Sequence, residues 1–178
     1  LRSNAVASHT SSRDHFVNHV FDAKGTRLSI DTLLKGKDNT IWTRSLSNEW
    51  GRLLDGNDFG VQGTKTCHFI SRTKVPRDRD VTYAMYVCDV KPLKSETHRV
   101  RITVGGDRLS CADDTGSPAA NMLETKILVN STISDAKHGA RFLSADIVSY
   151  FLASPMHRKE YMKVKASHIP HDIKIRYN

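Results

Sequence analysis

The sequence predicts an α+β domain, because helix-like and strand-like patterns alternate along much of the chain. Residues 38–56 place apolar side chains at the three- and four-residue spacing of an amphipathic helix. Residues 81–90 and 98–104 are dense in β-forming side chains and are joined by a short turn, which predicts an antiparallel hairpin. A second helical pattern covers residues 118–135. With 178 residues, the chain is long enough for one domain with a hydrophobic core.

Composition and charge narrow the class of protein. The chain is 38% hydrophobic, has no apolar run long enough to span a bilayer, and lacks a signal-peptide pattern at its N-terminus. Its three widely spaced cysteines favour reduced thiols over a disulfide framework. We therefore expect an intracellular protein, cytoplasmic or nuclear, that does not enter a membrane. The net charge of +8 fits an anionic partner such as nucleic acid, although a solvated basic face explains it equally well.

The first half of the chain is expected to hold a loosely ordered arm and then the first helix. Residues 1–36 are polar with few apolar anchors, leaving room for one short helix or hairpin. Asp38 is a favourable N-cap for the helix, which ends near Gly56. A short strand is predicted from Thr66 to Ile70. The apolar stripe of the helix consists of Ile41, Trp42, Leu46, Trp50, Leu53 and Leu54.

The hairpin is the first candidate for contact with an anionic ligand. Side chains alternate along a strand, so Arg99 and Arg101 are expected on one face. Two arginines in this arrangement offer a fork of hydrogen-bond donors to phosphate oxygens. An exposed cationic hairpin without a ligand remains the alternative.

The second half of the chain is expected to pack a helix against a strand. Ser117 and Pro118 mark the start of the helix at residues 118–135. Residues 140–147 alternate like a strand, against which that helix would pack. A further strand is predicted from Tyr161 to Lys165, followed by a polar, basic tail. Two histidines in that tail region, His168 and His171, are expected at the surface.

Asp146 is the candidate metal ligand, because it lies where the predicted strand gives way to a short helix. Ile147, Tyr150 and Phe151 follow at helical spacing, and Pro155 ends the pattern. A carboxylate at the rigid end of a strand is well placed to hold a divalent cation. Taken alone, Asp146 is explained as well by capping of the next helix.

The segment around Asp146 resembles the first catalytic motif of reverse transcriptases, most closely that of copia-type LTR retrotransposon polyproteins. In that family an Asp-hydrophobic-Lys-x-Phe-Tyr-Leu-x-Thr-Pro-Met run is followed by Glu-Tyr-Met. The agreement extends over ten positions in one register, which makes it specific. The matching residues are Asp146, Ile147, Tyr150, Phe151, Leu152, Pro155, Met156, Glu160, Tyr161 and Met162.

The resemblance implies a partial right-hand polymerase fold, with fingers at about residues 60–110 and an incomplete palm at about 111–178 of a domain spanning 37–178. The Trp-containing helix and the hairpin also look like copia-type segments. The family's fingers hairpin grips the triphosphate of the incoming deoxynucleotide. Arg101 and Arg99 match its Arg and Lys, and Lys91 falls at a further Lys of the preceding strand.

In this family two magnesium ions drive nucleotidyl transfer onto a DNA primer that is paired with an RNA template. Asp146 would bridge both ions, and the carbonyl of Ile147 would complete one coordination shell. Phe151 matches the bulky aromatic residue under the sugar of the nucleotide, although a core aromatic explains it as well.

Departures from the family pattern count against catalysis by this chain alone. Val148 and Ser149 replace the usual Lys and Asn or Thr, and no Tyr-x-Asp-Asp turn follows Asp146 within the 178 residues. The run Cys111-Ala112-Asp113-Asp114 precedes the motif and leads into a helix start, so it is not that turn. We expect a polymerase fragment that is inactive alone. The alternatives are a non-catalytic basic nucleic-acid-binding module and a protein-interaction domain whose charge serves solubility.

Overall fold

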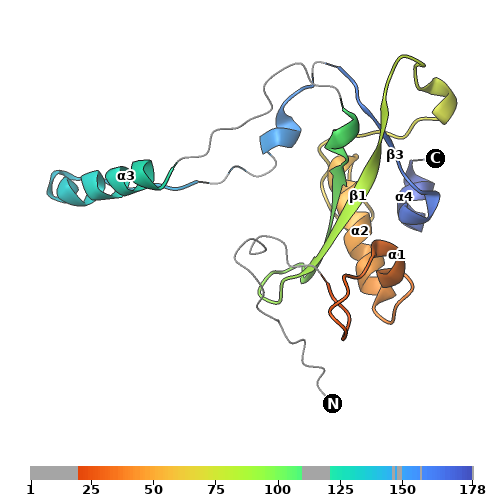
Figure 1. Ribbon diagram of the computed structural model, residues 1–178, viewed down its shortest axis with the longest axis horizontal. Helices are drawn as coiled ribbons and strands as arrows, with labels where there is room; N and C mark the ends of the chain where they lie inside the picture. Colours follow the sequence, from red (N-terminus) through yellow and green to blue (C-terminus); the bar gives the residue numbers. More distant parts are fainter. Residues whose placement is uncertain (1–19, 110–120, 146, 148–149, 157, 178) are drawn as a thin grey trace. The chain divides into compact units, whose positions relative to one another are not determined.

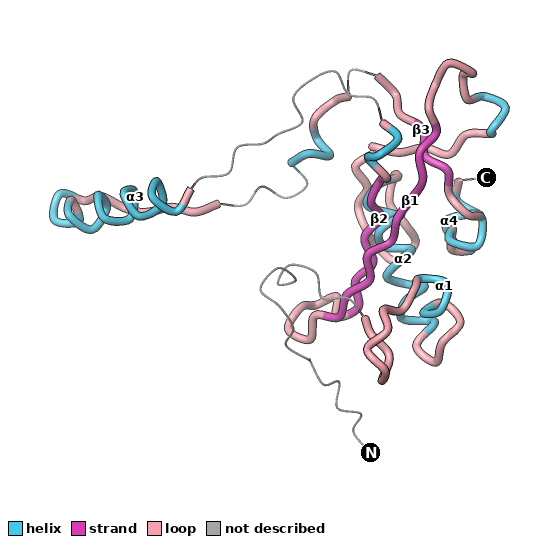
Figure 2. The backbone as a smooth tube through the Cα atoms, viewed as in Figure 1, coloured by secondary structure: helices cyan, strands magenta, loops and turns pink. Residues whose placement is uncertain are grey.

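The predicted hairpin forms two strands of a three-stranded sheet in the computed structural model (Figure 1). Strand β1, Val81–Val90, pairs antiparallel with β2, His98–Val104. The short strand β3, Tyr161–Lys163, pairs in parallel with the first residues of β1, which gives the order β2-β1-β3 (Figure 2). The hairpin is confirmed at the predicted residues, and the third strand begins where the sequence predicts it.

The structure describes residues 20–109, 121–145, 147, 150–156 and 158–177. They fall into two compact units, one formed by Leu1–Leu109 with Met156–Asn178 and the other by Ser110–Pro155. The mixed sheet and the four helices within the described ranges confirm the predicted α+β class. Across those same ranges, no helix is both long and apolar enough to cross a membrane.

Helix α2, Asn39–Leu53, supplies the largest buried side chains of the first unit. Its apolar residues recur at helical spacing, and Trp42, Leu46 and Trp50 are each at most 3% exposed. Asp38 occupies the N-cap as predicted, but its side chain makes no capping hydrogen bond. Ile41 departs from the predicted stripe, because 47% of its surface remains exposed.

Two short helices from opposite ends of the sequence complete the core. Helix α1, Ile30–Leu33, lies within the predicted arm and buries Ile30 and Leu33. Helix α4, His171–Arg176, lies in what the sequence predicts as a polar tail, yet its Ile173 is fully buried. The sequence did not indicate this burial, because Ile173 and Ile175, two residues apart in a six-residue helix, show no helical period.

His168 corrects another prediction, since it is 3% exposed instead of lying at the surface. Its Nε2 is 2.8 Å from Oδ1 of Asp31 in α1, and its carbonyl oxygen accepts a hydrogen bond from Nε1 of Trp50 at 2.9 Å. A buried imidazole needs such a partner. Here the partner is 137 residues away in sequence, so no local pattern indicates it.

Residues Thr66 to Ile70 do not form the predicted strand. The preceding segment and Cys67 instead donate backbone hydrogen bonds to the last carbonyl oxygens of α2. The N–H of Thr64 binds the carbonyl of Arg52 at 2.8 Å, and that of Cys67 binds the carbonyl of Leu53 at 2.9 Å. The last carbonyls of a helix have no partner within the helix, and this segment satisfies them.

The second unit contains helix α3, Met122–Ser134, which begins four residues later than predicted. Asn121 is its N-cap and forms a capping box with Glu124, with the two backbone-to-side-chain bonds at 2.9 and 3.0 Å. The predicted cap, Ser117, lies outside the described residues.

Residues 140–145 do not form the predicted strand. A strand needs a partner for its backbone groups, and no strand of the described residues lies in this unit. Tyr150–Ala153 forms a 3-10 turn where the sequence predicts a short helix. Helix α3 has no buried residue, so the predicted packing against that strand is also wrong.

Candidate phosphate-binding face of the hairpin

The register of the hairpin determines which side chains share a face. Val87 pairs with Arg101 and Asp89 pairs with Arg99, and paired residues lie on the same side of an antiparallel sheet. The two arginines therefore lie on one face, as the sequence predicts. The opposite face carries Val100, which is fully buried against the core.

Arg101 is the cation of this face that is available to a ligand. Its side chain is exposed, and it forms no ion pair with any residue in the described part of the chain. Its pairing with Val87 of β1 holds its backbone, so only the side chain has to be ordered when an anion binds. A guanidinium in this setting can present two parallel N–H groups to phosphate oxygens.

Lys91 and Arg99 are more constrained, because both lie beside a buried carboxylate. Asp89 is only 4% exposed, and its Oδ2 is 3.5 Å from Nζ of Lys91. Its Oδ1 and Nε of Arg99 are both buried without a hydrogen-bond partner among the described residues. Lys91, Arg99 and Arg101 contribute +3 and Asp89 contributes −1, which leaves a local charge of +2.

Asp89 is a residue that the sequence analysis missed. The signal was available, since it is the one acid in a strand, VTYAMYVCDV, that otherwise consists of β-forming or small side chains. An acid inside such a strand is costly to bury unless a cation lies near it. Lys91, whose Nζ is 3.5 Å from Oδ2 of Asp89, supplies that cation.

Tyr83 marks the other end of the same face. Its hydroxyl donates a hydrogen bond to Oδ1 of Asp107 at 2.8 Å, and this bond raises the pKa of the phenol. The guanidinium of Arg108 lies 5.2 Å from the centre of its ring, within cation–π range. Arg108 is thus a further cation near this face that the sequence analysis did not single out.

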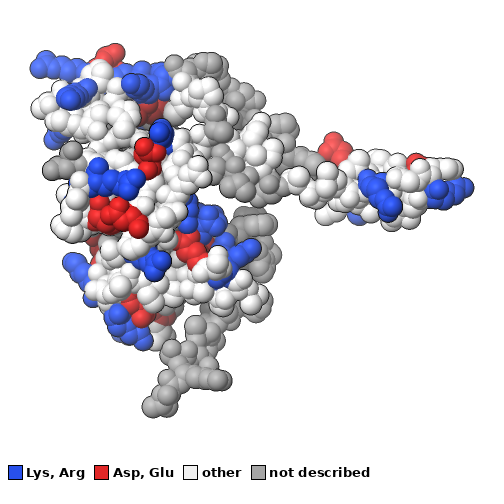
Figure 3. Space-filling model, turned by 180° about the vertical axis from the view of Figure 1, so that it is seen from behind, with Lys and Arg blue, Asp and Glu red and all other residues white. Residues whose placement is uncertain are grey.

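Charge is mixed on the face of the molecule shown in Figure 3. Acidic side chains lie among the Lys and Arg side chains of the larger unit there, so its cations do not form one uninterrupted patch. Several charged side chains of the first unit are paired, including Arg52 with Glu96 and Arg176 with Asp58. The net charge of +8 is therefore a weaker guide to a binding surface than the specific arrangement on the hairpin.

The other predicted site residues belong to the second unit. Asp146 lies outside the described residues, Ile147 is 65% exposed, and Phe151 lies in the 3-10 turn Tyr150–Ala153, although its side chain is outside the description. Within the described ranges, no three His, Cys, Asp or Glu side chains form a group able to hold a metal ion.

Comparison of the chain with models of protein families, with curated proteins and with solved structures found no match. The functional assignment therefore rests on the residues of this chain and on the geometry of the hairpin.

Proposed function

We propose that the chain is a fragment of an RNA-directed DNA polymerase of a copia-type retrotransposon, comprising the fingers and the first part of the palm. In this proposal the hairpin binds the triphosphate of a deoxynucleotide. The observation that carries the proposal is the placement of Arg99 and Arg101 on one face of an antiparallel hairpin, with Arg101 exposed. The ten-position match around Asp146 supports the same assignment.

The chemistry of the hairpin suits a polyanion. Arg101 supplies a free guanidinium, and Arg99 supplies a second one two residues away on the same strand face. Lys91 adds an ammonium group that Asp89 holds near that face. A triphosphate carries several negative charges over a short length, so it gains from both arginines at once.

The proposal is limited to binding. The family's chemistry uses two magnesium ions, which need several carboxylate oxygens in a fixed geometry. Asp146 is the one carboxylate that the resemblance assigns, and the described residues contain no group of three candidate ligands. Asp146 itself lies outside the described residues, so we propose no catalytic step for this chain alone.

Nucleotide binding by the 178-residue chain tests the proposal directly. A deoxynucleoside triphosphate is titrated against the wild type and against Arg101→Ala by isothermal titration calorimetry. Loss of a charge-assisted hydrogen bond is expected to weaken binding roughly tenfold or more. Lys94→Ala is the matched control, because Lys94 is an exposed cation in the turn of the same hairpin. Equal affinities for Arg101→Ala and the wild type would contradict the proposal.

A non-catalytic module that binds RNA or DNA is the second candidate, and the net charge of +8 favours it. Such a module would bind a primer–template duplex with an affinity that falls steeply as salt rises, because bound counterions are released. It would show no preference for a free triphosphate. Duplex binding that Arg101→Ala leaves unchanged, together with no measurable triphosphate binding, would favour this candidate over the first.

A further inference from the structure

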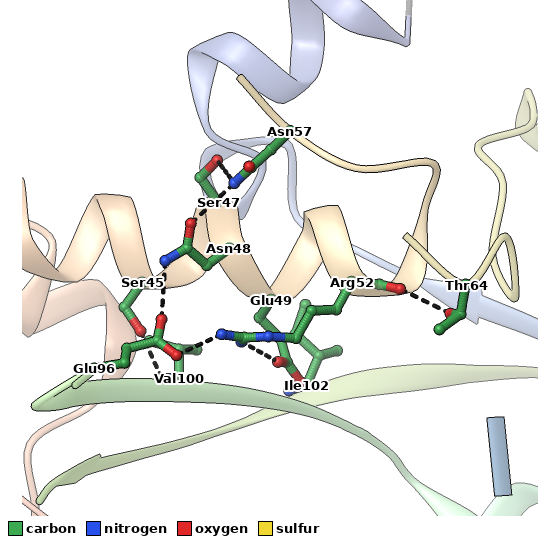
Figure 4. Close-up of polar contacts among 10 residues, drawn as sticks. All are labelled: Ser45, Ser47, Asn48, Glu49, Arg52, Asn57, Thr64, Glu96, Val100 and Ile102. Atoms are coloured by element: carbon green, nitrogen blue, oxygen red, sulfur yellow. Dashed lines mark hydrogen bonds and ion pairs between the residues drawn. The ribbon is translucent and has the colours of Figure 1, made fainter. Parts of the chain in front are cut away.

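Helix α2 satisfies two backbone groups at the outer edge of β2, where a sheet would otherwise place another strand. The N–H of Val100 donates to Oγ of Ser45 at 2.8 Å, and the N–H of Ile102 donates to Oε1 of Glu49 at 3.2 Å (Figure 4). Residues four apart on a helix are about 6 Å apart along its axis, and residues two apart on a strand are about 6.6 Å apart. The two spacings match, so Ser45 and Glu49 fix the register of β2 on the helix.

A second set of contacts fastens the turn of the hairpin to the same helix. Arg52 donates to Oε2 of Glu49 at 3.1 Å with one nitrogen and pairs with Glu96 with the other. Asn48 donates to Oε1 of Glu96 at 3.0 Å. Glu96 lies in the turn between β1 and β2, so the turn and the edge of β2 are held by adjacent side chains of α2 (Figure 4).

These contacts alternate with the arginines of the phosphate-binding face. Val100 and Ile102 lie on either side of Arg101 in the sequence, and both are held through their N–H groups. A slip of β2 by one residue would move every side chain of the strand to the opposite face. The contacts from α2 oppose such a slip and hold the backbone from which Arg101 extends.

We infer that Glu49 and Arg52 are positioning residues for triphosphate binding, acting through the hairpin without touching the ligand. This inference rests on the proposed function. Glu49 serves two partners, the N–H of Ile102 and the guanidinium of Arg52, and its side chain is 12% exposed. Its removal leaves the N–H of Ile102 without its acceptor, leaves Arg52 with Glu96 alone, and leaves Ser45 as the one remaining contact to the edge of β2 among those described above.

The substitutions Glu49→Ala and Glu49→Gln distinguish the positioning role of Glu49 from the effect of its negative charge on triphosphate binding. We expect Glu49→Ala to weaken triphosphate binding about fivefold to tenfold, as for a lost hydrogen bond that leaves a donor unpaired. The glutamine of Glu49→Gln keeps a carbonyl oxygen for the N–H of Ile102, so it should restore most of the affinity. Removal of a negative charge near a polyanion site would by itself strengthen binding, so a loss in Glu49→Ala has the opposite sign to the electrostatic effect.

A double-mutant cycle with Arg101→Ala provides the decisive readout. If Glu49 acts through Arg101, Glu49→Ala causes little further loss in the Arg101→Ala background. A general loss of folded protein would instead weaken binding by the same factor in both backgrounds. Circular dichroism confirms that each variant is folded, and Arg52→Met replaces Glu49→Ala in the cycle if the latter does not fold.

Arg44→Met is the matched control for Arg52→Met. Arg44 is also an arginine of α2, but it lies over the ring of Phe59 at 5.0 Å and forms no hydrogen bond or ion pair with the described residues of the hairpin. We expect Arg52→Met to weaken triphosphate binding and Arg44→Met to leave it unchanged. If Arg101→Ala weakens binding but neither Glu49→Ala nor Arg52→Met does, the positioning role is overturned. If Arg101→Ala itself has no effect, the proposed function fails first.

Discussion

The substitution Ile173→Ala tests whether helix α4 belongs to the folded core of the first unit. Ile173 is 0% exposed and lies in the cluster that contains Trp50 and Leu46. Alanine lacks three carbon atoms of isoleucine, and at about 0.8 kcal/mol for each buried group their transfer is worth about 2.4 kcal/mol. The cavity left behind raises the expected loss to about 3 to 4 kcal/mol. That is a large fraction of the roughly 5 to 15 kcal/mol that stabilises a typical domain.

Urea unfolding followed by tryptophan fluorescence measures this loss. Trp42 and Trp50 are both buried in the same core, so their emission reports unfolding of the first unit. Ile175→Ala is the matched control, because Ile175 lies on the same helix and is 68% exposed. It is expected to change the free energy of unfolding by less than about 0.5 kcal/mol. Equal midpoints for the two variants would refute the packing of α4 described above.

Three further predictions concern polar and steric features of the first unit. A hydrogen bond from His168 lowers the pKa of Asp31 below its ordinary value of 3.8, so the stabilisation that Asp31 contributes is present above that value and is lost as the pH falls through the lower folded pKa. Because 43% of the Asp31 side chain is exposed, solvent screens the interaction, and Asp31→Asn should lower the free energy of unfolding at pH 7 by less than about 1 kcal/mol and flatten the acid limb of the stability curve. Burial raises the pKa of the Cys88 thiol to about 11, so iodoacetamide at pH 8 should leave Cys88 unmodified in the native protein and modify it in urea, as measured by mass spectrometry. Rapid modification of Cys88 in the native protein would show that the thiol is accessible. A Cβ on Gly63 would come within 2.1 Å of a backbone oxygen, whereas a Cβ on Gly106 would meet nothing within 4 Å. Gly63→Ala should therefore lower the melting temperature and reduce the free energy of unfolding by about 1 to 3 kcal/mol, and Gly106→Ala should not.

The parts of the fold that the sequence predicts well are those whose signal is local. The hairpin follows from two runs of β-forming residues separated by seven residues, and α2 follows from apolar side chains at helical spacing. Both patterns lie within a span of at most 24 residues, so neither depends on distant partners. The shared face of Arg99 and Arg101 was predictable for the same reason, because alternation along a strand fixes it.

The features that the sequence did not predict depend on partners far away in the chain. His168 is buried because Asp31 lies beside it, and Ile173 is buried because helix α2 is there to receive it. The segment Thr66 to Ile70 has β-forming residues, yet the N–H of Cys67 binds the end of α2. Residues of high β-propensity fit a pleated surface, but they form a strand only beside another strand. None of the strands within the described residues pairs with this segment.

Helix α2 shows why a short sheet of this kind can hold the proposed binding face in place. A hairpin alone is marginally stable, and β3 supports only the first residues of β1. The support for β2 comes instead from polar side chains of the helix, which bind the N–H groups of Val100 and Ile102. Because these bonds reach the backbone, they constrain the strand without using the side chains of Arg99 and Arg101. The two side chains differ in exposure, since Arg101 is exposed and Arg99 is half-buried opposite Asp89 in the strand register.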